Sequence, residues 1–91
     1  MFTAPWCAPC KPVARALAEL APRFPSARFA EVDVDDEPES AMRFGVLTLP
    51  TVVILRDDEA IAVIDGARPR ADYERALEEV LPAAGGDALD S

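Results

Sequence analysis

The two cysteines of the sequence, Cys7 and Cys10, lie three positions apart in the stretch Trp6-Cys7-Ala8-Pro9-Cys10-Lys11. Residues three apart share one face of a helix, with side chains about 5–6 Å apart. A disulfide requires α-carbons roughly 4.4–6.8 Å apart, so the pair can close without breaking a helix. The loop that it closes is very short, and the cross-link therefore stabilises the fold only weakly. The spacing predicts a disulfide that opens and closes during function.

The two sulfurs are expected to differ in reactivity. We expect Cys7 at the start of the first helix, where unpaired amide groups and the helix dipole favour a thiolate, which is the attacking species. Cys10 is expected one turn further along and more buried, in position to attack a mixed disulfide. Pro9 lacks an N–H group and stiffens this turn. The chain contains no histidine that could stabilise the thiolate further, which favours a reductant over a strong oxidant.

Composition limits the other possibilities. Hydrophobic residues make up 51% and charged residues 29% of the 91 residues, which is typical of one small globular domain. We assign this domain to residues 1–82 and interpret residues 83–91 as a flexible tail. The net charge of −8 argues against nucleic acid and membrane partners. Without a signal peptide or membrane-spanning run, we expect a cytoplasmic protein, in which a close cysteine pair is catalytic or metal-binding.

Metal binding is the less favoured of these two functions. A CxxC pair commonly supplies two of four zinc ligands, but the chain has no histidine and no further cysteine. The acidic run at residues 31–37 lacks the glycine and the ligand spacing of a calcium loop, and we interpret it as a solvated strand edge and helix start. We therefore expect no metal and no bound cofactor apart from the redox-active cysteine pair.

Hydrophobic periodicity and the positions of proline and glycine predict the order helix, strand, helix, strand, strand, helix, which indicates an α/β fold. The predicted turn between the last two strands is Asp57-Asp58. The segments are a helix at 12–21, a strand at 27–35, a helix at 38–44, strands at 51–55 and 60–64, and a last helix, beginning near Pro69 and ending before Pro82, whose apolar stripe is Tyr73, Ala76, Leu77, Val80 and Leu81.

Three motifs in this order resemble those of the thioredoxin family. The stretch Trp6-Cys7-Ala8-Pro9-Cys10-Lys11, followed by a helix, resembles its redox motif. The segment Thr48-Leu49-Pro50-Thr51, just before a buried strand, is similar to its cis-proline loop. Gly66 follows the hairpin and precedes the terminal amphipathic helix, as the resemblance requires. The resemblance extends from Phe2 to about Leu81 and implies a thioredoxin-like fold.

The resemblance also implies an activity and the residues that carry it out. The protein is expected to reduce protein disulfides by dithiol–disulfide exchange, with electrons from a thioredoxin reductase-type donor. Cys7 is implied as the nucleophile and Cys10 as the resolving thiol. The backbone of Leu49, before a cis Pro50, is implied to pair with the substrate peptide like a short strand. The implied substrate-binding surface consists of Trp6, Pro9, Leu49, Pro50 and Gly66.

The sequence departs from the family at its start. The family fold begins with a strand, a helix and a central strand, and here only Phe2 and one neighbour match that central strand, so the fold is expected to be N-terminally truncated. The flanking strands are then expected to be unpaired or forced together. Three explanations stay open: a misplaced start of a longer chain, which we favour; a strand borrowed from a partner by an otherwise monomeric protein; or a sheet that has closed the gap.

A second departure concerns proton transfer. Thioredoxins carry a buried aspartate just before the phenylalanine that Phe2 matches, paired with a lysine on the next strand, and these positions hold Met1 and Glu31 here. Exchange is expected to be slower unless Glu31 points inward. Two alternatives to an enzyme also stay open at this point: a non-catalytic binding module with the same fold, and an inactive fragment of a longer thioredoxin.

Overall fold

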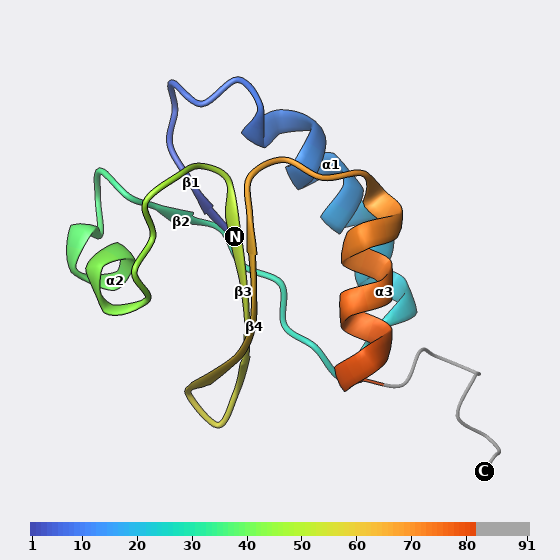
Figure 1. Cartoon of the computed structure of the whole chain (residues 1–91). Helices are drawn as coiled ribbons and strands as arrows, with labels where there is room; N and C mark the ends of the chain where they lie inside the picture. The colour runs from blue at the N-terminus through green and yellow to red at the C-terminus, as the bar shows by residue number, and fades with distance from the viewer. Residues whose placement is uncertain (82–91) are drawn as a thin grey trace, which may run out of the picture.

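The computed structural model describes residues 1–81, so the predicted tail at residues 83–91 lies outside the described part. The chain forms a four-stranded sheet flanked by helices (Figure 1). In chain order the elements are β1 (Phe2–Thr3), α1 (Cys10–Leu20), the 3₁₀ turn η1 (Ala21–Arg23), β2 (Val32–Asp33), α2 (Pro38–Arg43), β3 (Thr51–Arg56), β4 (Glu59–Asp65) and α3 (Arg70–Val80). Among these helices, none is long and apolar enough to cross a membrane.

The sheet has the strand order β2-β1-β3-β4. Strand β1 runs parallel to β2 and antiparallel to β3, and Phe2 is paired with Val32 on one side and with Thr51 on the other. The flanking strands were expected to be unpaired or forced together. This expectation is wrong at Phe2, because β2 and β3 both pair with β1 there. Strands β3 and β4 form an antiparallel hairpin. Its turn residues Asp57 and Asp58 have φ angles of 53° and 67°, which confirms the predicted turn.

The strand predicted at residues 27–35 is much shorter in the structure, where β2 contains only Val32 and Asp33. The reason lies in its partner, because β1 is itself two residues long and offers pairing only to this part of the segment. The alternation of valine and acid was a correct indication of a strand but gave no information about the length of the neighbouring strand. Residues 27–31 run beside the sheet without a strand partner among the described residues.

The main core lies between the sheet and helices α1 and α3, which cover the same side of it, whereas α2 lies on the other side (Figure 1). The predicted stripe of the last helix is confirmed, since Tyr73 and Leu77 are buried and Ala76, Val80 and Leu81 pack against the core. The buried residues of the main core are Val13, Leu20, Phe24, Val52, Ile54, Tyr73 and Leu77.

Candidate active site

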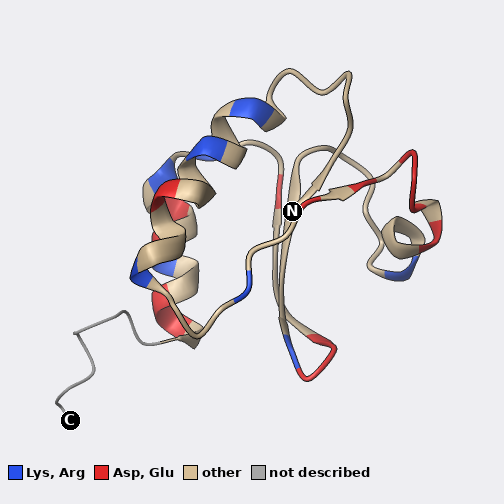
Figure 2. Cartoon of the chain, turned by 180° about the vertical axis from the view of Figure 1, so that it is seen from behind, with Lys and Arg blue, Asp and Glu red and all other residues tan. Residues whose placement is uncertain are grey.

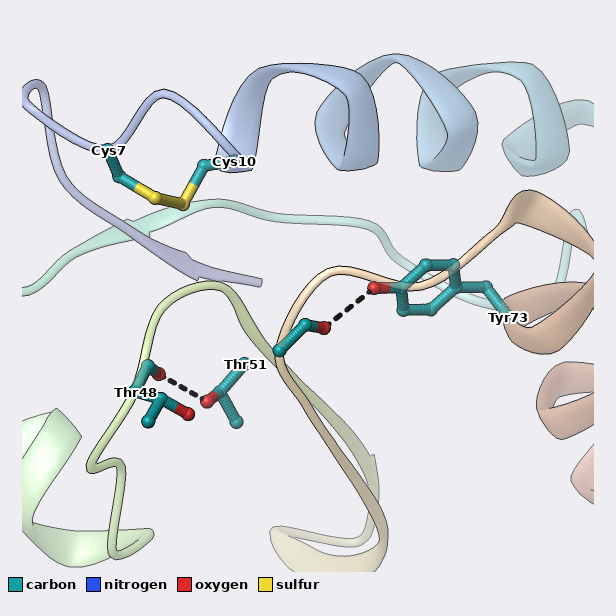
Figure 3. Close-up of a disulfide and its surroundings, with 6 residues drawn as sticks. Cys7, Cys10, Thr48, Thr51 and Tyr73 are labelled. Atoms are coloured by element: carbon teal, nitrogen blue, oxygen red, sulfur yellow. Dashed lines mark hydrogen bonds between the residues drawn. A yellow bond between two sulfur atoms is a disulfide. The ribbon is translucent and has the colours of Figure 1, made fainter.

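The two cysteines form a disulfide with their α-carbons 5.4 Å apart (Figure 3). Both residues are buried, with 4% of Cys7 and 2% of Cys10 exposed. They form a small cluster with Ala4, against which Val34 and Leu49 pack. The end of β1, the segment after β2 and the loop before β3 therefore all converge on the disulfide.

The start of the helix differs from the expectation. Helix α1 begins at Cys10, and Cys7 lies in the preceding turn, where its amide donates to the Ala4 carbonyl at 3.0 Å. The Cys10 amide donates to the Cys7 carbonyl at 3.3 Å, so one tight turn connects the two cysteines. Pro9 is exposed and is the N-cap residue of α1, with φ −65° and no side-chain cap hydrogen bond. The amides of Cys10 and Lys11 donate to the Cys7 and Ala8 carbonyls, so the turn that contains Cys7 lies directly against the N-terminus of α1.

The loop before β3 brings its backbone to the disulfide. The Leu49–Pro50 peptide bond is cis, as the resemblance implied. Leu49 is half-buried and packs against the cysteine cluster, whereas Pro50 is fully buried. Pro50 therefore supports this loop from the interior of the protein. The surface next to the disulfide consists of Leu49 and the main chain.

Gly66 is held beside the cis-proline loop. Its amide donates to the Pro50 carbonyl at 2.8 Å. Its φ of 79° lies in the left-handed region, where a side chain is strained, and this explains a glycine at the end of β4. The Tyr73 hydroxyl donates to the Gly66 carbonyl at 3.2 Å, which joins α3 to the site (Figure 3). The helix that completes the core therefore also fixes a main-chain segment near the disulfide.

A second support lies inside the loop itself. Thr51 is completely buried, and its hydroxyl donates to the Thr48 carbonyl at 2.6 Å (Figure 3). Both residues belong to the predicted loop motif, but the motif alone did not indicate this contact. The side-chain hydrogen bond satisfies a carbonyl that the cis turn leaves without a strand partner, and so stabilises the loop conformation.

Trp6 is not a core residue, since 68% of it is exposed. Its indole Nε1 donates to Asp35 Oδ2 at 3.0 Å, and the Asp35 amide in turn donates to Asp33 Oδ1 at 2.8 Å. This partner was not predicted from the sequence, because the acidic run at residues 31–37 was interpreted as solvated. The only indication of this contact in the sequence was the position of Asp35 just after β2, the strand that pairs with β1. The contact restrains the indole of the residue next to Cys7 while most of Trp6 stays exposed.

We predict that Asp35→Ala frees this ring. The steady-state fluorescence anisotropy of Trp6, the single tryptophan of the chain, is expected to fall in this variant. The exposed hydrogen bond contributes little to folding, so the free energy of unfolding is expected to change by less than about 1 kcal/mol. Asp36→Ala is the matched control, since it removes an adjacent exposed carboxylate that has no contact with the indole. Equal anisotropy changes in the two variants would contradict the assignment.

A second prediction concerns Tyr73, the only tyrosine in the chain. Burial raises the pKa of its hydroxyl, while the hydrogen bond from the Arg68 amide and the Arg68 charge lower it by less. Because the folded-state pKa is raised, the stabilisation is complete below the unfolded value of about 10 and is lost as the pH rises through the folded-state pKa. We expect Tyr73→Phe to lower the free energy of unfolding by about 1–3 kcal/mol at neutral pH, since the Gly66 carbonyl and Arg68 amide lose a partner.

Denaturant unfolding between pH 7 and pH 11 checks this prediction. The difference between wild type and Tyr73→Phe is expected to narrow above about pH 10. Tyrosinate absorbance gives the folded-state titration directly, because no other tyrosine contributes. A difference that stays constant over the whole range would show that Tyr73 ionises equally in both states.

The acid expected near Cys10 is not supplied by Glu31, because Glu31 is exposed in the structure. The possibility that Glu31 points inward is therefore wrong. Among residues 1–81, no group of three or more histidine, cysteine or acidic side chains is placed to hold a metal ion. The chemistry available at the site is that of the two sulfurs.

Comparison with known proteins agrees with this site. The family model of thioredoxin matches residues 1–79. Thioredoxin of Mycobacterium tuberculosis is 40% identical over 82 residues, which are 89% of this chain and 71% of that protein. Thioredoxin of Bacillus subtilis is 36% identical over 81 residues, or 88% of this chain and 74% of that protein.

Solved structures show the same relationship. The oxidised form of mitochondrial thioredoxin 3 from Saccharomyces cerevisiae matches with a TM-score of 0.80 and 34% identity, covering 87% of this chain and 74% of that one. The germline-specific thioredoxin Deadhead of Drosophila melanogaster matches with a TM-score of 0.81 and 31% identity, covering 88% of this chain and 76% of that one. The fold, the Cys7–Cys10 disulfide and these matches lead to one conclusion: the chain belongs to the thioredoxin family and is a thiol–disulfide oxidoreductase that reduces protein disulfides.

Proposed function

We propose that Cys7 is the attacking thiol and Cys10 the resolving thiol of this reaction. The observation that carries the proposal is the difference in their positions: Cys10 is the first residue of α1, and Cys7 lies in the turn before it. The amides of the first helical turn have no side-chain cap, and a helix N-terminus favours a negatively charged sulfur. A thiolate at Cys7 gains this stabilisation without entering the helix.

The proposed cycle has two exchange steps. In the first, the Cys7 thiolate attacks one sulfur of the substrate disulfide; the substrate S–S bond breaks, and its other sulfur leaves as a thiolate. In the second, the Cys10 sulfur attacks Cys7 Sγ in the mixed disulfide, and its proton passes to the departing substrate. The products are a substrate with two reduced sulfurs and the Cys7–Cys10 disulfide, which is the state of the structure.

We propose that the substrate chain lies across Trp6, Pro9, Leu49 and Gly66, over the loop shaped by Pro50. The exposed indole of Trp6, next to Cys7 in the chain, and the half-buried Leu49, which packs against the cysteine cluster, offer apolar contact. An extended substrate segment can pair with the backbone of Leu49 in the manner of strand addition. Support comes from the hydrogen bond between Gly66 and Pro50 and from the packing of Leu49, which together hold this backbone against the cysteines.

The cycle also needs an electron donor. Thioredoxins receive electrons from a reductase, and we propose a thioredoxin reductase-type flavoprotein as the donor for this chain. We place the cycle in the cytoplasm, where such a donor keeps close cysteine pairs reduced. The protein itself holds the electrons only as the two thiols, so the proposal requires no bound cofactor.

Trapping of the mixed disulfide tests the assignment of the two thiols. In Cys10→Ser the first exchange step is retained and the second is lost, so a disulfide-bonded model protein such as insulin is expected to become covalently attached through Cys7. Non-reducing electrophoresis and mass spectrometry of the linked peptides identify the attachment. Cys7→Ser is the matched variant, and it is expected to trap little, because it lacks the proposed attacking thiol in the turn before α1. Attachment mainly through Cys10 would reverse the roles, and no attachment in either variant would favour a binding module.

A further inference from the structure

The hydroxyl of Tyr73 makes two main-chain hydrogen bonds in the turn between β4 and α3. It donates to the Gly66 carbonyl at 3.2 Å (Figure 3) and accepts from the Arg68 amide at 3.1 Å. A phenol hydroxyl is both a donor and an acceptor, so one side chain satisfies two main-chain groups of the turn. Only 1% of Tyr73 is exposed, and it belongs to the main core. The hydroxyl therefore holds residues 66–68 against a side chain that is itself fixed in the core.

The same turn is joined to the loop that carries Leu49. The Gly66 carbonyl accepts from Tyr73, and the Gly66 amide donates to the Pro50 carbonyl at 2.8 Å. Pro50 follows Leu49 through the cis peptide bond, and Leu49 packs against the cysteine cluster. Three consecutive links thus connect α3 to the main chain beside the disulfide: the hydroxyl, the glycine and the proline carbonyl. Movement of Gly66 away from α3 would loosen this main chain.

The outer side of Gly66 is open in the part of the chain that the structure describes. A β-carbon placed on Gly66 would meet no atom within 4 Å other than those of its chain neighbours. An incoming polypeptide therefore has room to approach the main chain of this turn from outside. Tyr73 holds the same main chain from the interior.

The side-chain contacts of Arg68 restrain the turn much less. Its Nε donates to the Asp65 carbonyl at 3.3 Å, and its guanidinium lies 3.9 Å from the Asp72 carboxylate. The Arg68 side chain is 52% exposed, and charged residues of both signs lie along α3 (Figure 2). Exposed ion pairs contribute little, because water and salt screen them and the side chains lose conformational freedom. The buried hydroxyl of Tyr73 is therefore the contact that determines the position of the turn.

We propose that Tyr73 is a positioning residue for polypeptide substrates, because its hydroxyl holds Gly66 and, through Pro50, the main chain of Leu49 in the conformation that receives the substrate. This inference rests on the proposed substrate surface. Tyr73 belongs to the main core and not to the cysteine cluster, so it acts on the substrate through the main chain. A main chain that is already ordered loses less conformational entropy when a substrate chain binds to it. A small disulfide that contacts only the sulfur atoms gains nothing from this order.

Comparison of a protein disulfide with a small disulfide tests this role in Tyr73→Phe, which removes the hydroxyl and keeps the ring. Reduced protein, freed from dithiothreitol, is mixed with an excess of insulin or of bis(hydroxyethyl) disulfide. Alkylation and mass spectrometry follow the loss of the two protein thiols and give a second-order rate constant for each disulfide. The constant for insulin is expected to fall about three- to tenfold, and the constant for the small disulfide to change less than about twofold. Attack by Cys7 is common to both reactions, so their ratio reports the binding of the polypeptide.

Val80→Ala is the control for lost stability. Val80 packs against the main core about two turns after Tyr73 on the same helix. Its truncation is expected to lower stability and to leave the ratio of the two rate constants at the wild-type value, with both variants assayed where circular dichroism shows them folded. Amide hydrogen exchange measured by NMR adds a structural readout. Relative to the amides of α1, the Gly66 amide is expected to exchange faster in Tyr73→Phe but not in Val80→Ala.

Trp6→Ala separates a failure of this inference from a failure of the proposed substrate surface. It removes an exposed part of that surface and leaves the Tyr73 hydrogen bonds in place, so it is also expected to lower the constant for insulin alone. If Trp6→Ala changed the ratio and Tyr73→Phe did not, the surface would be correct and the role of Tyr73 wrong. If neither variant changed it, the surface itself would be wrong, and the role of Tyr73 with it. An equal fall for both disulfides in Tyr73→Phe, or the same change of ratio in Val80→Ala, would also overturn the proposal.

Discussion

Cys7→Ser is expected to abolish catalysed reduction of protein disulfides, leaving only the rate that the chemical reductant gives alone. Serine keeps the shape of the turn between Ala4 and Cys10 but provides no thiolate at neutral pH, so the first exchange step cannot occur. The assay is turnover of insulin disulfides with dithiothreitol as electron source. The fold is expected to be retained, because the lost cross-link closes a loop with a sequence separation of only 3 and stabilises weakly.

A control tests whether activity requires a thiol at position 7 or only two thiols in the chain. Adding Ser26→Cys to Cys7→Ser restores two thiols, but Ser26 lies in an exposed turn away from the start of α1. This double variant is expected to remain inactive. If it recovered activity, reactivity would belong to any exposed cysteine of the chain, and the turn before α1 would have no special part in catalysis.

Phe24→Ala is expected to cost about 3–5 kcal/mol of folding free energy. Phe24 is completely buried among Leu20, Tyr73 and Leu77, and its removal leaves a cavity between the helices and the sheet. Domains of this size are stable by only about 5–15 kcal/mol, so the loss is a large fraction of the total. Urea unfolding is expected to show a lower midpoint with an unchanged slope, and a cooperative wild-type transition would also exclude an inactive, unfolded fragment.

Leu47→Ala provides the comparison for this variant. Leu47 is 93% exposed, so the substitution removes an apolar side chain without leaving a cavity. Its cost is expected to stay within about 0.5 kcal/mol. Similar losses in Phe24→Ala and Leu47→Ala would mean that the described core does not determine stability.

The order of the elements and the two cysteines followed from sequence because both are local. Apolar periodicity in α1 and α3 depends on neighbours a few residues apart, and so does the spacing of Cys7 and Cys10. The resemblance supplied the cis bond at Pro50, which local patterns do not determine. Cys7 was expected at the start of the first helix but lies in the turn before it, because a tight turn and a first helical turn have similar sequence preferences here.

The features that sequence did not provide depend on contacts between distant segments. The hydrogen bond between Trp6 and Asp35 joins residues that are 29 positions apart, and no local pattern indicates which acid the indole selects. The length of β2 was overestimated for the same reason, since the pairing of residues 27–31 depends on a strand elsewhere in the chain. Tyr73 was correctly placed in the core, but its hydroxyl contact with Gly66 requires the position of the whole helix.

The pairing of β1 also has a consequence for biosynthesis. Phe2 lies between Val32 and Thr51, so a ribosome must pass Thr51 before the middle of the sheet can close. Until then the two cysteines emerge without Leu49 to cover them, and they are open to oxidants of the cell. Within residues 1–91 scrambling is not possible, because these residues contain two cysteines and the one intramolecular bond between them is the Cys7–Cys10 disulfide of the structure.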